Sequence, residues 1–130
     1  MNEHIPLAPF TTFHIGGPAR YFTEAQSVEE VKEALAFARA NSLPVFTLGG
    51  GSNLLVPDGG VDGVVLKMAM CDINFESDGA DTLLITGAGA GWDGVIDAMG
   101  EKGIFGIENL AGIPGTVGGA VVQNIGAYGA

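Results

Sequence analysis

The feature that most constrains this chain is a run of three glycines set between two apolar segments. Residues 45–56 read VFTLGGGSNLLV. The segment before the glycines is typical of a strand, and the apolar residues after them predict a second strand over 53–56. Because consecutive glycines can adopt backbone angles that a Cβ forbids, their N–H groups can turn toward one point. Such a concavity favours an anion, most often a phosphate.

The glycine run does not match the common nucleotide-binding motifs. No lysine follows it, so it is not a P-loop, and it lacks the G-x-G-x-x-G spacing of a dinucleotide fingerprint. Ser52 and Asn53 would add side-chain donors at the rim. A tight turn that needs glycine only for its shape remains an open alternative. Taken alone, the local pattern gives phosphate binding only weak support.

A second glycine-rich stretch, residues 103–129, reads GIFGIENLAGIPGTVGGAVVQNIGAYG. Between Gly112 and Ala120, small or flat residues alternate with bulky aliphatic ones. A surface without side chains lets a flat ring lie against the backbone, with amide N–H groups at the polar edge of the ring. Close backbone packing between two lobes is the alternative. We predict that the two glycine-rich stretches form opposite walls of one long cofactor groove.

Charge and cysteine content narrow the class of protein. The 15 acidic and 5 basic residues give a net charge of −10, which argues against a nucleic-acid or anionic-membrane surface. Backbone amides can still bind phosphates in an acidic protein. A single cysteine excludes an internal disulfide and suggests a reducing compartment. With no signal-peptide pattern at the N-terminus, we expect a cytoplasmic protein.

The periodicity of apolar residues predicts two helices and several short strands. Ser27 with Glu30 three residues later forms a capping-box pattern, which predicts a helix whose apolar stripe includes Val28, Val31, Leu35 and Ala38. A second helix should run over 92–102 and stop at Gly103. After an extended and irregular start, further strands are expected over 20–23, 45–48, 63–68, 72–76 and 82–86. Strand–helix–strand thus recurs twice, and we predict two lobes, residues 1–66 and 67–130.

Several single residues have a functional and a structural interpretation. Cys71 has no basic neighbour in sequence, so we expect a buried packing residue rather than a nucleophile. Trp92 is expected in the core. Burial would raise the pKa of Glu108, although a solvated loop carboxylate is the simpler explanation. Two interpretations of Tyr128 have equal weight: an ordinary aromatic residue at the boundary between core and surface, or a contact to a ligand. Neither histidine has partners at metal-ligand spacing, so no metal site is predicted.

Three segments, in this order and spacing, closely resemble the UDP-N-acetylenolpyruvoylglucosamine reductase family. They are the LGGGSNLLV turn, the GAGAGW segment that opens a helix, and the block NLAGIPGTVGGAVVQNIGAYG. The last block is specific to that family, whereas GGGSN alone indicates only the broader flavoprotein superfamily with a p-cresol methylhydroxylase-type FAD domain. TTFHIGGPARY also resembles the opening of the family, although His14 stands where the family commonly has Arg.

The resemblance implies an α+β fold of the PCMH/VAO type, in which two α+β lobes hold FAD and the second lobe of this chain is incomplete. It assigns the FAD pyrophosphate and the remaining FAD contacts to the two glycine-rich stretches, and a substrate contact to the second. The pyrophosphate residues are Gly49, Gly50, Gly51, Ser52, Asn53 and Leu54. The other FAD residues are Ile113, Pro114, Gly115, Gly118, Gly119, Ala120, Asn124, Gly126 and Ala127, and the substrate residue is Tyr128.

The resemblance also implies a reaction, that of UDP-N-acetylmuramate dehydrogenase. NADPH passes hydride to FAD, and the reduced flavin passes it to the enolpyruvyl double bond of UDP-N-acetylglucosamine enolpyruvate. This oxidoreductase step serves peptidoglycan synthesis, and through it cell wall biogenesis, cell shape and cell division. The expected partners are the UDP-sugar and NADPH, with no nucleic acid, membrane or obligate protein partner. The flavin performs the hydride chemistry, while the protein supplies placement and electrostatics.

One departure from the family concerns length. In the longer chains of the family, an Arg, a proton-donating Ser and a Glu act on the enolpyruvyl group, and all three follow the IGAYG block. We therefore assign no catalytic residue in this chain and expect an N-terminal fragment without the C-terminal substrate-binding domain. Without those residues the developing enolate would lack its stabilising charge and its proton, so the fragment should be inactive alone.

Two other functions remain open from the sequence. One is the FAD-binding part of a different oxidase or dehydrogenase of the same superfamily, although no His or Cys lies near GGGSN for covalent flavin attachment. The other is a non-catalytic nucleotide-binding protein. Bound flavin would make the purified protein yellow, which separates the flavoproteins from this last alternative.

Overall fold

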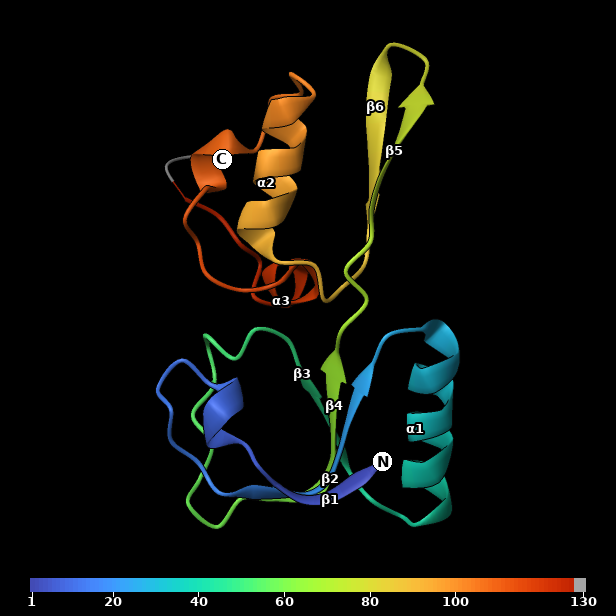
Figure 1. The fold of residues 1–130 in the computed structure, drawn as a ribbon, viewed down its shortest axis with the longest axis vertical. Coiled ribbons are helices and arrows are strands. Elements are labelled where there is room, and N and C mark those ends of the chain that lie inside the picture. The colour runs from blue at the N-terminus through green and yellow to red at the C-terminus, as the bar shows by residue number, and fades with distance from the viewer. Residues whose placement is uncertain (128–130) are drawn as a thin grey trace. The chain divides into compact units, whose positions relative to one another are not determined.

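The chain divides into two compact units, Met1–Ala69 and Met70–Ala130, as seen in a computed structural model that describes residues 1–127 (Figure 1). Strand β4 (Val61–Met68) belongs wholly to the first unit, so the division falls after Ala69, whereas residue 66 was expected from the sequence. Both units combine strands with helices, in agreement with the α+β class that the sequence predicted.

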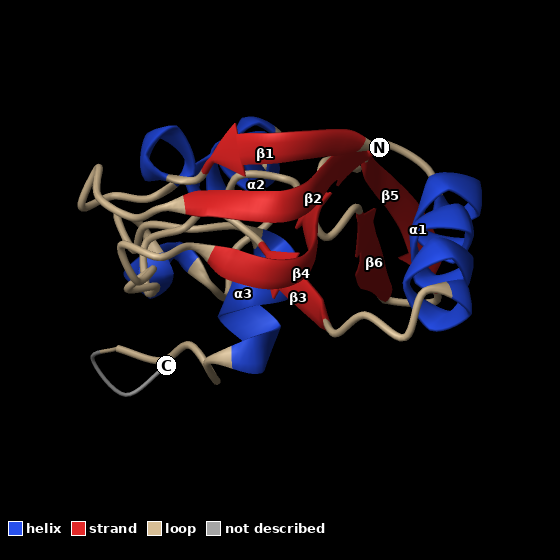
Figure 2. Cartoon of the chain, turned by 90° about the horizontal axis from the view of Figure 1, so that it is seen from below, coloured by secondary structure: helices blue, strands red, loops and turns tan. Residues whose placement is uncertain are grey.

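The first unit is built on a four-stranded sheet in the order β1-β2-β4-β3. Strand β1 (Asn2–Pro6) runs antiparallel to β2 (Pro18–Ala25), while β2 and β3 (Val45–Leu48) both run parallel to β4. Helix α1 (Val28–Ala40) provides the crossover that two parallel strands require. Figure 2 shows these four strands side by side in this order, with α1 next to the sheet.

Strand β4 has apolar residues on both faces because both faces of the sheet are covered. Val65 packs in one cluster with Leu7 and Phe22, and Leu66 packs in another with Ala34 of α1. Successive residues of a strand point to opposite faces. The near-continuous apolar run of β4 is therefore the pattern expected of a buried parallel strand.

Helix α1 begins as the sequence predicts. The hydroxyl of Ser27 accepts the N–H of Glu30 at 3.2 Å, and the Glu30 carboxylate accepts the N–H of Gln26 at 2.6 Å. The predicted apolar stripe is only partly correct. Ala34 and Ala38 are the buried residues of the helix, whereas Leu35 is 47% exposed, because the close helix–sheet contact selects the small side chains.

Two local predictions in the first unit were wrong. The start of the chain, expected to be extended and irregular, is extended but regular: it pairs with β2 as β1 and continues into a short 3-10 helix, η1 (Ala8–Phe10). The run over 53–56, expected to be a strand, has no strand partner. Its neighbour instead is the turn before β2, where the N–H of Gly17 donates to the carbonyl of Pro57 at 2.9 Å. Apolar residues alone do not distinguish a strand from a loop packed on a sheet.

The second unit begins with an antiparallel hairpin, β5 (Ile73–Asp78) and β6 (Asp81–Thr86). Helix α2 (Trp92–Glu101) follows, then the short η2 (Glu108–Leu110) and α3 (Val117–Val122). No strand follows α2 within residues 70–127, so the expected second strand–helix–strand repeat is a hairpin followed by helices.

The core of the second unit forms where α2 meets the hairpin and the surrounding loops. Val95 and Met99 of α2 are buried together with Ala90, and Phe75 and Leu84 of the hairpin pack against them. Gly103, with φ +68°, follows the C-terminal residues of α2. The predicted helix stop is confirmed, because a left-handed residue after a helix is most readily a glycine.

Candidate functional site

The predicted phosphate turn lies at the carboxyl end of a parallel strand set. Gly49 follows the last residue of β3, and β2 and β4 end at the same edge of the sheet because the three strands are parallel. Ligands of open α/β sheets bind outside this edge. The fold therefore places the glycine run at the edge where a binding site is expected.

Gly51 has a structural role of its own. Its φ is +71°, and a Cβ at this position would overlap the carbonyl oxygen of Phe10. The carbonyl of Gly51 in turn accepts the N–H of Thr12 at 3.1 Å. One of the three glycines is thus required by the shape of the turn and by the close approach of the segment after η1.

Gly49 and Gly50 line a hollow within the first unit. Its volume is about 390 Å³, which lies in the range of small-molecule sites. The segment that includes η1 forms another part of its lining, and β4 contributes one side chain. The lining residues are Pro9, Phe10, Thr11, Thr12, His14, Gly49, Gly50 and Lys67.

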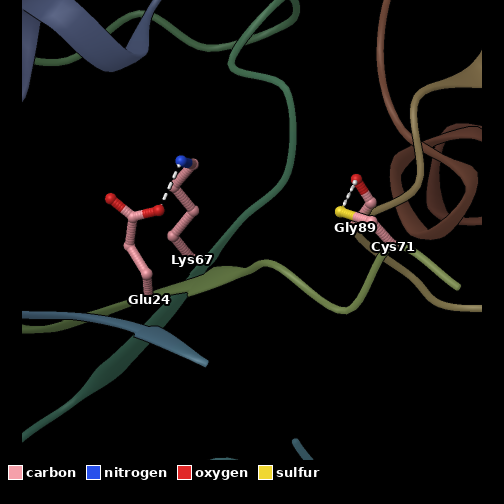
Figure 3. A network of polar contacts seen from close by, with 4 residues as sticks. All are labelled: Glu24, Lys67, Cys71 and Gly89. Carbon is pink, nitrogen blue, oxygen red and sulfur yellow. Dashed lines mark hydrogen bonds and ion pairs between the residues drawn. The ribbon is translucent and has the colours of Figure 1, made fainter. Parts of the chain in front are cut away.

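Lys67, like the lining residues between Pro9 and His14, was not predicted as a site residue from the sequence. In the register of the sheet, Lys67 of β4 lies opposite Leu48, the last residue before the glycine run. Its ammonium is 2.8 Å from the Glu24 carboxylate (Figure 3) and 5.1 Å from the centre of the Phe10 ring. A lysine directly after the apolar run 64–66, close to the carboxyl end of the strand, was the signal available in the sequence.

The lining of this hollow does not include Ser52, Asn53 or Leu54 of the predicted phosphate turn. Ser52 is half-buried, and Asn53 and Leu54 are exposed. Leu54 lines a second, mainly apolar hollow of about 450 Å³ together with Phe46 and Leu55. This hollow borders the edge strand β3.

In the second unit, the predicted ring-binding segment packs on the segment before α2. The N–H of Gly118 donates to the carbonyl of Ala88 at 2.9 Å, and the N–H of Val117 donates to Ala90 at 3.0 Å. In the other direction, the N–H of Trp92 donates to Gly115 at 3.1 Å. Close backbone packing, which the sequence analysis considered as an alternative between lobes, thus occurs inside the second unit.

Most amides of this segment already have partners. The N–H of Gly112 donates to the Asp93 carboxylate at 2.8 Å, and the hydroxyl of Thr116 accepts the N–H of Gly119 at 3.4 Å. The N–H of Ala120 donates to the Thr116 carbonyl at 2.8 Å. Thr116 therefore caps α3, a helix that the sequence analysis did not predict because two of its six residues are glycines.

The other predicted residues of the second glycine-rich stretch differ in their exposure to solvent. Asn124 follows α3 with φ +52°, a left-handed conformation that Asn tolerates better than most residues. Ile113 and Ala127 are half-buried, and Pro114 and Gly126 are exposed. Tyr128, the predicted substrate contact, lies outside the described residues. Whether the two glycine-rich stretches line one groove depends on the placement of the two units and stays a prediction.

Three single-residue interpretations can be compared with the structure. Glu108 is exposed, and its pKa is lowered because its carboxylate accepts the N–H of Gly106 at 2.6 Å and its own backbone N–H. Cys71, expected to be buried, is exposed, with its Sγ 3.4 Å from the Gly89 carbonyl (Figure 3). Trp92 is half-buried, and its ring N–H donates to Leu110 at 3.0 Å.

Residues 1–127 contain neither a membrane-spanning helix nor a cluster of metal-ligating side chains. The helices of this part of the chain are too short or too polar to cross a membrane. The same residues contain no group of three or more His, Cys, Asp or Glu side chains placed to hold a metal ion.

A hollow of small-molecule size beside a glycine turn, within a two-unit α+β chain, is the arrangement expected of a nucleotide-cofactor domain. The chain belongs to the FAD binding domain family, whose model matches residues 19–130.

Its relatives are more specific. It is 46% identical over 130 residues to the UDP-N-acetylenolpyruvoylglucosamine reductase of Pseudomonas aeruginosa, covering 99% of this chain and 38% of the relative. The reductase of Saccharopolyspora erythraea is 43% identical over 124 residues, which cover 95% of this chain and 34% of the relative. The resemblance that the sequence analysis stated is therefore confirmed.

A solved structure supports the same relationship. The crystal structure of UDP-N-acetylenolpyruvylglucosamine reductase from Thermus caldophilus matches with a TM-score of 0.75 and 34% sequence identity. The match covers 97% of this chain and 43% of that chain. The chain therefore spans less than half the length of these relatives.

Proposed function

We propose that this chain is the FAD-binding part of a UDP-N-acetylmuramate dehydrogenase, an NADPH-dependent oxidoreductase of peptidoglycan synthesis. The observation that carries the proposal is 46% identity across nearly the whole chain to a protein named as that reductase. The substrates would be NADPH and UDP-N-acetylglucosamine enolpyruvate, and the whole protein would act in the cytoplasm. Bound FAD would supply the hydride-transfer chemistry.

The first unit fits the diphosphate part of FAD. Gly49 and Gly50 line a hollow that also has a lysine in its lining. A diphosphate is bound by backbone N–H groups in a concave turn and by a nearby cation. We propose that residues Gly49–Leu54 contact this part of the cofactor and that Lys67 lies beside it.

The second unit would contact FAD in a different way. Because the N–H groups of Gly112 and of residues 117–120 are used inside the unit, they are poorly placed to donate to a ring. We propose that Ile113, Pro114, Gly115 and their neighbours offer a flat surface rather than a row of donors. Asn124, Gly126 and Ala127 would contact FAD beyond α3, and Tyr128 would contact the substrate.

The division of labour between this chain and the rest of a whole reductase is part of the proposal. The chain spans 38% of the Pseudomonas aeruginosa relative, and the residues that the resemblance assigns to the enolpyruvyl group follow the IGAYG block. The two units of this chain would then be the two lobes of the FAD domain. A separate substrate-binding domain would complete the enzyme.

An absorbance spectrum of the purified protein, with FAD added and unbound FAD removed, tests the proposal. Flavin bands that remain with the protein are expected, and a colourless protein would overturn the assignment of an FAD site. In a whole reductase, oxidation of NADPH that depends on the enolpyruvyl UDP-sugar is expected, while response to a hydroxy acid instead would indicate another oxidase. Turnover of that UDP-sugar by these 130 residues alone would contradict the proposed division of labour.

A further inference from the structure

Lys67 is placed differently from Arg20 and Lys32, two other basic residues of the first unit. Arg20 pairs with Asp62 on an exposed surface, and Lys32 pairs with Glu29 along α1. The side chain of Lys67 is 28% exposed, compared with 47% for Arg20 and 71% for Lys32. Lys67 also lines the hollow beside Gly49 and Gly50, which neither Arg20 nor Lys32 does.

The ammonium of Lys67 is held in place by two neighbours. Glu24 of β2 accepts from it at 2.8 Å (Figure 3). The centre of the Phe10 ring lies 5.1 Å away. An ammonium on a flexible stem gains binding strength when its position is fixed before the ligand arrives. Phe10 also lines the hollow, whereas Glu24 is absent from the lining, so the cation lies where an anion in the hollow can reach it.

The net charge of the protein makes such a cation more important. At a net charge of −10, the protein repels a dianionic ligand at long range, and backbone amides contribute only partial charges. A full positive charge beside the glycine turn would offset that repulsion. A charge-assisted hydrogen bond to a phosphate oxygen is also about twice as strong as a neutral one.

We propose that Lys67 binds the diphosphate of the dinucleotide cofactor, with Glu24 and Phe10 positioning its ammonium. This inference rests on the proposed function, because that function supplies the cofactor. It adds a side-chain cation to a site that the sequence assigned to the glycine turn. The alternative is that Lys67 serves only a structural ion pair with Glu24.

Titrations followed by flavin fluorescence test the role of Lys67. Lys67→Met keeps most of the stem against Phe10 and removes the charge, and we expect it to weaken FAD binding about tenfold or more. Lys67→Arg should retain most of the affinity. Lys32→Met is the matched control, because it removes one exposed positive charge from α1, and its affinity should match that of the wild type.

Two further measurements separate a ligand contact from a structural ion pair. Riboflavin lacks phosphate, so its affinity should be the same in the wild type and in Lys67→Met, and the salt dependence of FAD binding should be shallower in the variant. Glu24→Gln removes the ion pair but keeps the cation and an acceptor beside it, so FAD affinity should fall less than in Lys67→Met. Equal losses in Glu24→Gln and Lys67→Met would overturn the proposal in favour of the structural ion pair.

Titration of the wild type and of Lys67→Met with inorganic pyrophosphate distinguishes failure of this inference from failure of the proposed function. If the wild type binds FAD and Lys67→Met binds it equally well at every salt concentration, the role of Lys67 is refuted and the FAD site stands. If the wild type binds pyrophosphate through Lys67 but not FAD, the anion site stands and the proposed function fails. Binding of neither ligand by the folded wild type refutes both.

Discussion

The backbone N–H of Gly118 donates to the carbonyl of Ala88 at 2.9 Å, and a Cβ on Gly118 would lie 3.0 Å from both the Cβ and the carbonyl oxygen of Ala88. These two residues join the N-terminal turn of α3 to the glycine-rich loop before α2. A side chain at Gly118 would therefore require Ala88 to move by a few tenths of an ångström, whether or not a cofactor also contacts the segment.

Gly118→Ala should be less stable than Gly119→Ala, because the added Cβ requires Ala88 to move. Gly119 provides a matched control one residue away in the same helix, because its Cβ would meet only the Thr116 hydroxyl at an ordinary 3.5 Å. Overpacking costs about 1–3 kcal/mol, whereas Ala for Gly in a helix gains up to about 1 kcal/mol. Urea unfolding should therefore rank Gly119→Ala above Gly118→Ala, and equal stability of the two variants would show that Ala88 yields without cost.

Gly51→Ala should destabilise the protein through both strain and overlap. The left-handed backbone alone costs an L-residue about 1–2 kcal/mol, and the added Cβ also overlaps the Phe10 carbonyl oxygen. Gly59→Ala is the control, since a Cβ there meets nothing within 4 Å. Thermal unfolding should show a clear loss for Gly51→Ala and little change for Gly59→Ala. A similar small change in both would mean that the turn rearranges freely.

Ser27→Ala should weaken the N-terminus of α1. The Ser27 hydroxyl accepts the N–H of Glu30 at 3.2 Å, and loss of an N-cap costs about 1 kcal/mol. Ser27→Asp supplies another acceptor at the same position and should restore the stability. Chemical denaturation measures both variants. A Ser27→Asp variant as unstable as Ser27→Ala would indicate that the hydroxyl acts through something other than capping.

The pKa of Glu108 should lie below its usual value in the folded protein, because the N–H of Gly106 donates to its carboxylate. A carboxylate whose pKa is lower in the folded state stabilises that state above the unfolded pKa. The contribution is lost as pH falls through the folded pKa. A carboxyl-detected NMR titration measures the shift, and Glu108→Gln should be less stable than the wild type near neutral pH, with the difference shrinking in acid. A Glu108 pKa at or above its usual value would contradict this.

Local features of the sequence predicted the elements whose causes are themselves local. The capping pair Ser27 and Glu30, the stop at Gly103, and strands β3 and β4 could all be predicted because each depends on a few neighbouring residues. The apolar run over 53–56 has the same composition as a strand. In the structure this run is a loop that lies against Gly16 and Gly17. The sequence pattern did not show this contact, because the two segments are far apart in the chain.

By itself, the sequence determined the membership of the FAD-binding family and the position of the glycine turn, because both depend on residue order. Only the tertiary structure decided that Gly51 serves a close backbone approach, that Gly118 packs on Ala88, and that Cys71 is exposed. It also placed Lys67 beside Gly49 and Gly50, although they are far apart in the chain. The physical reason is that parallel strands bring their carboxyl ends to one edge, and which strands are neighbours is settled by packing on both faces of the sheet.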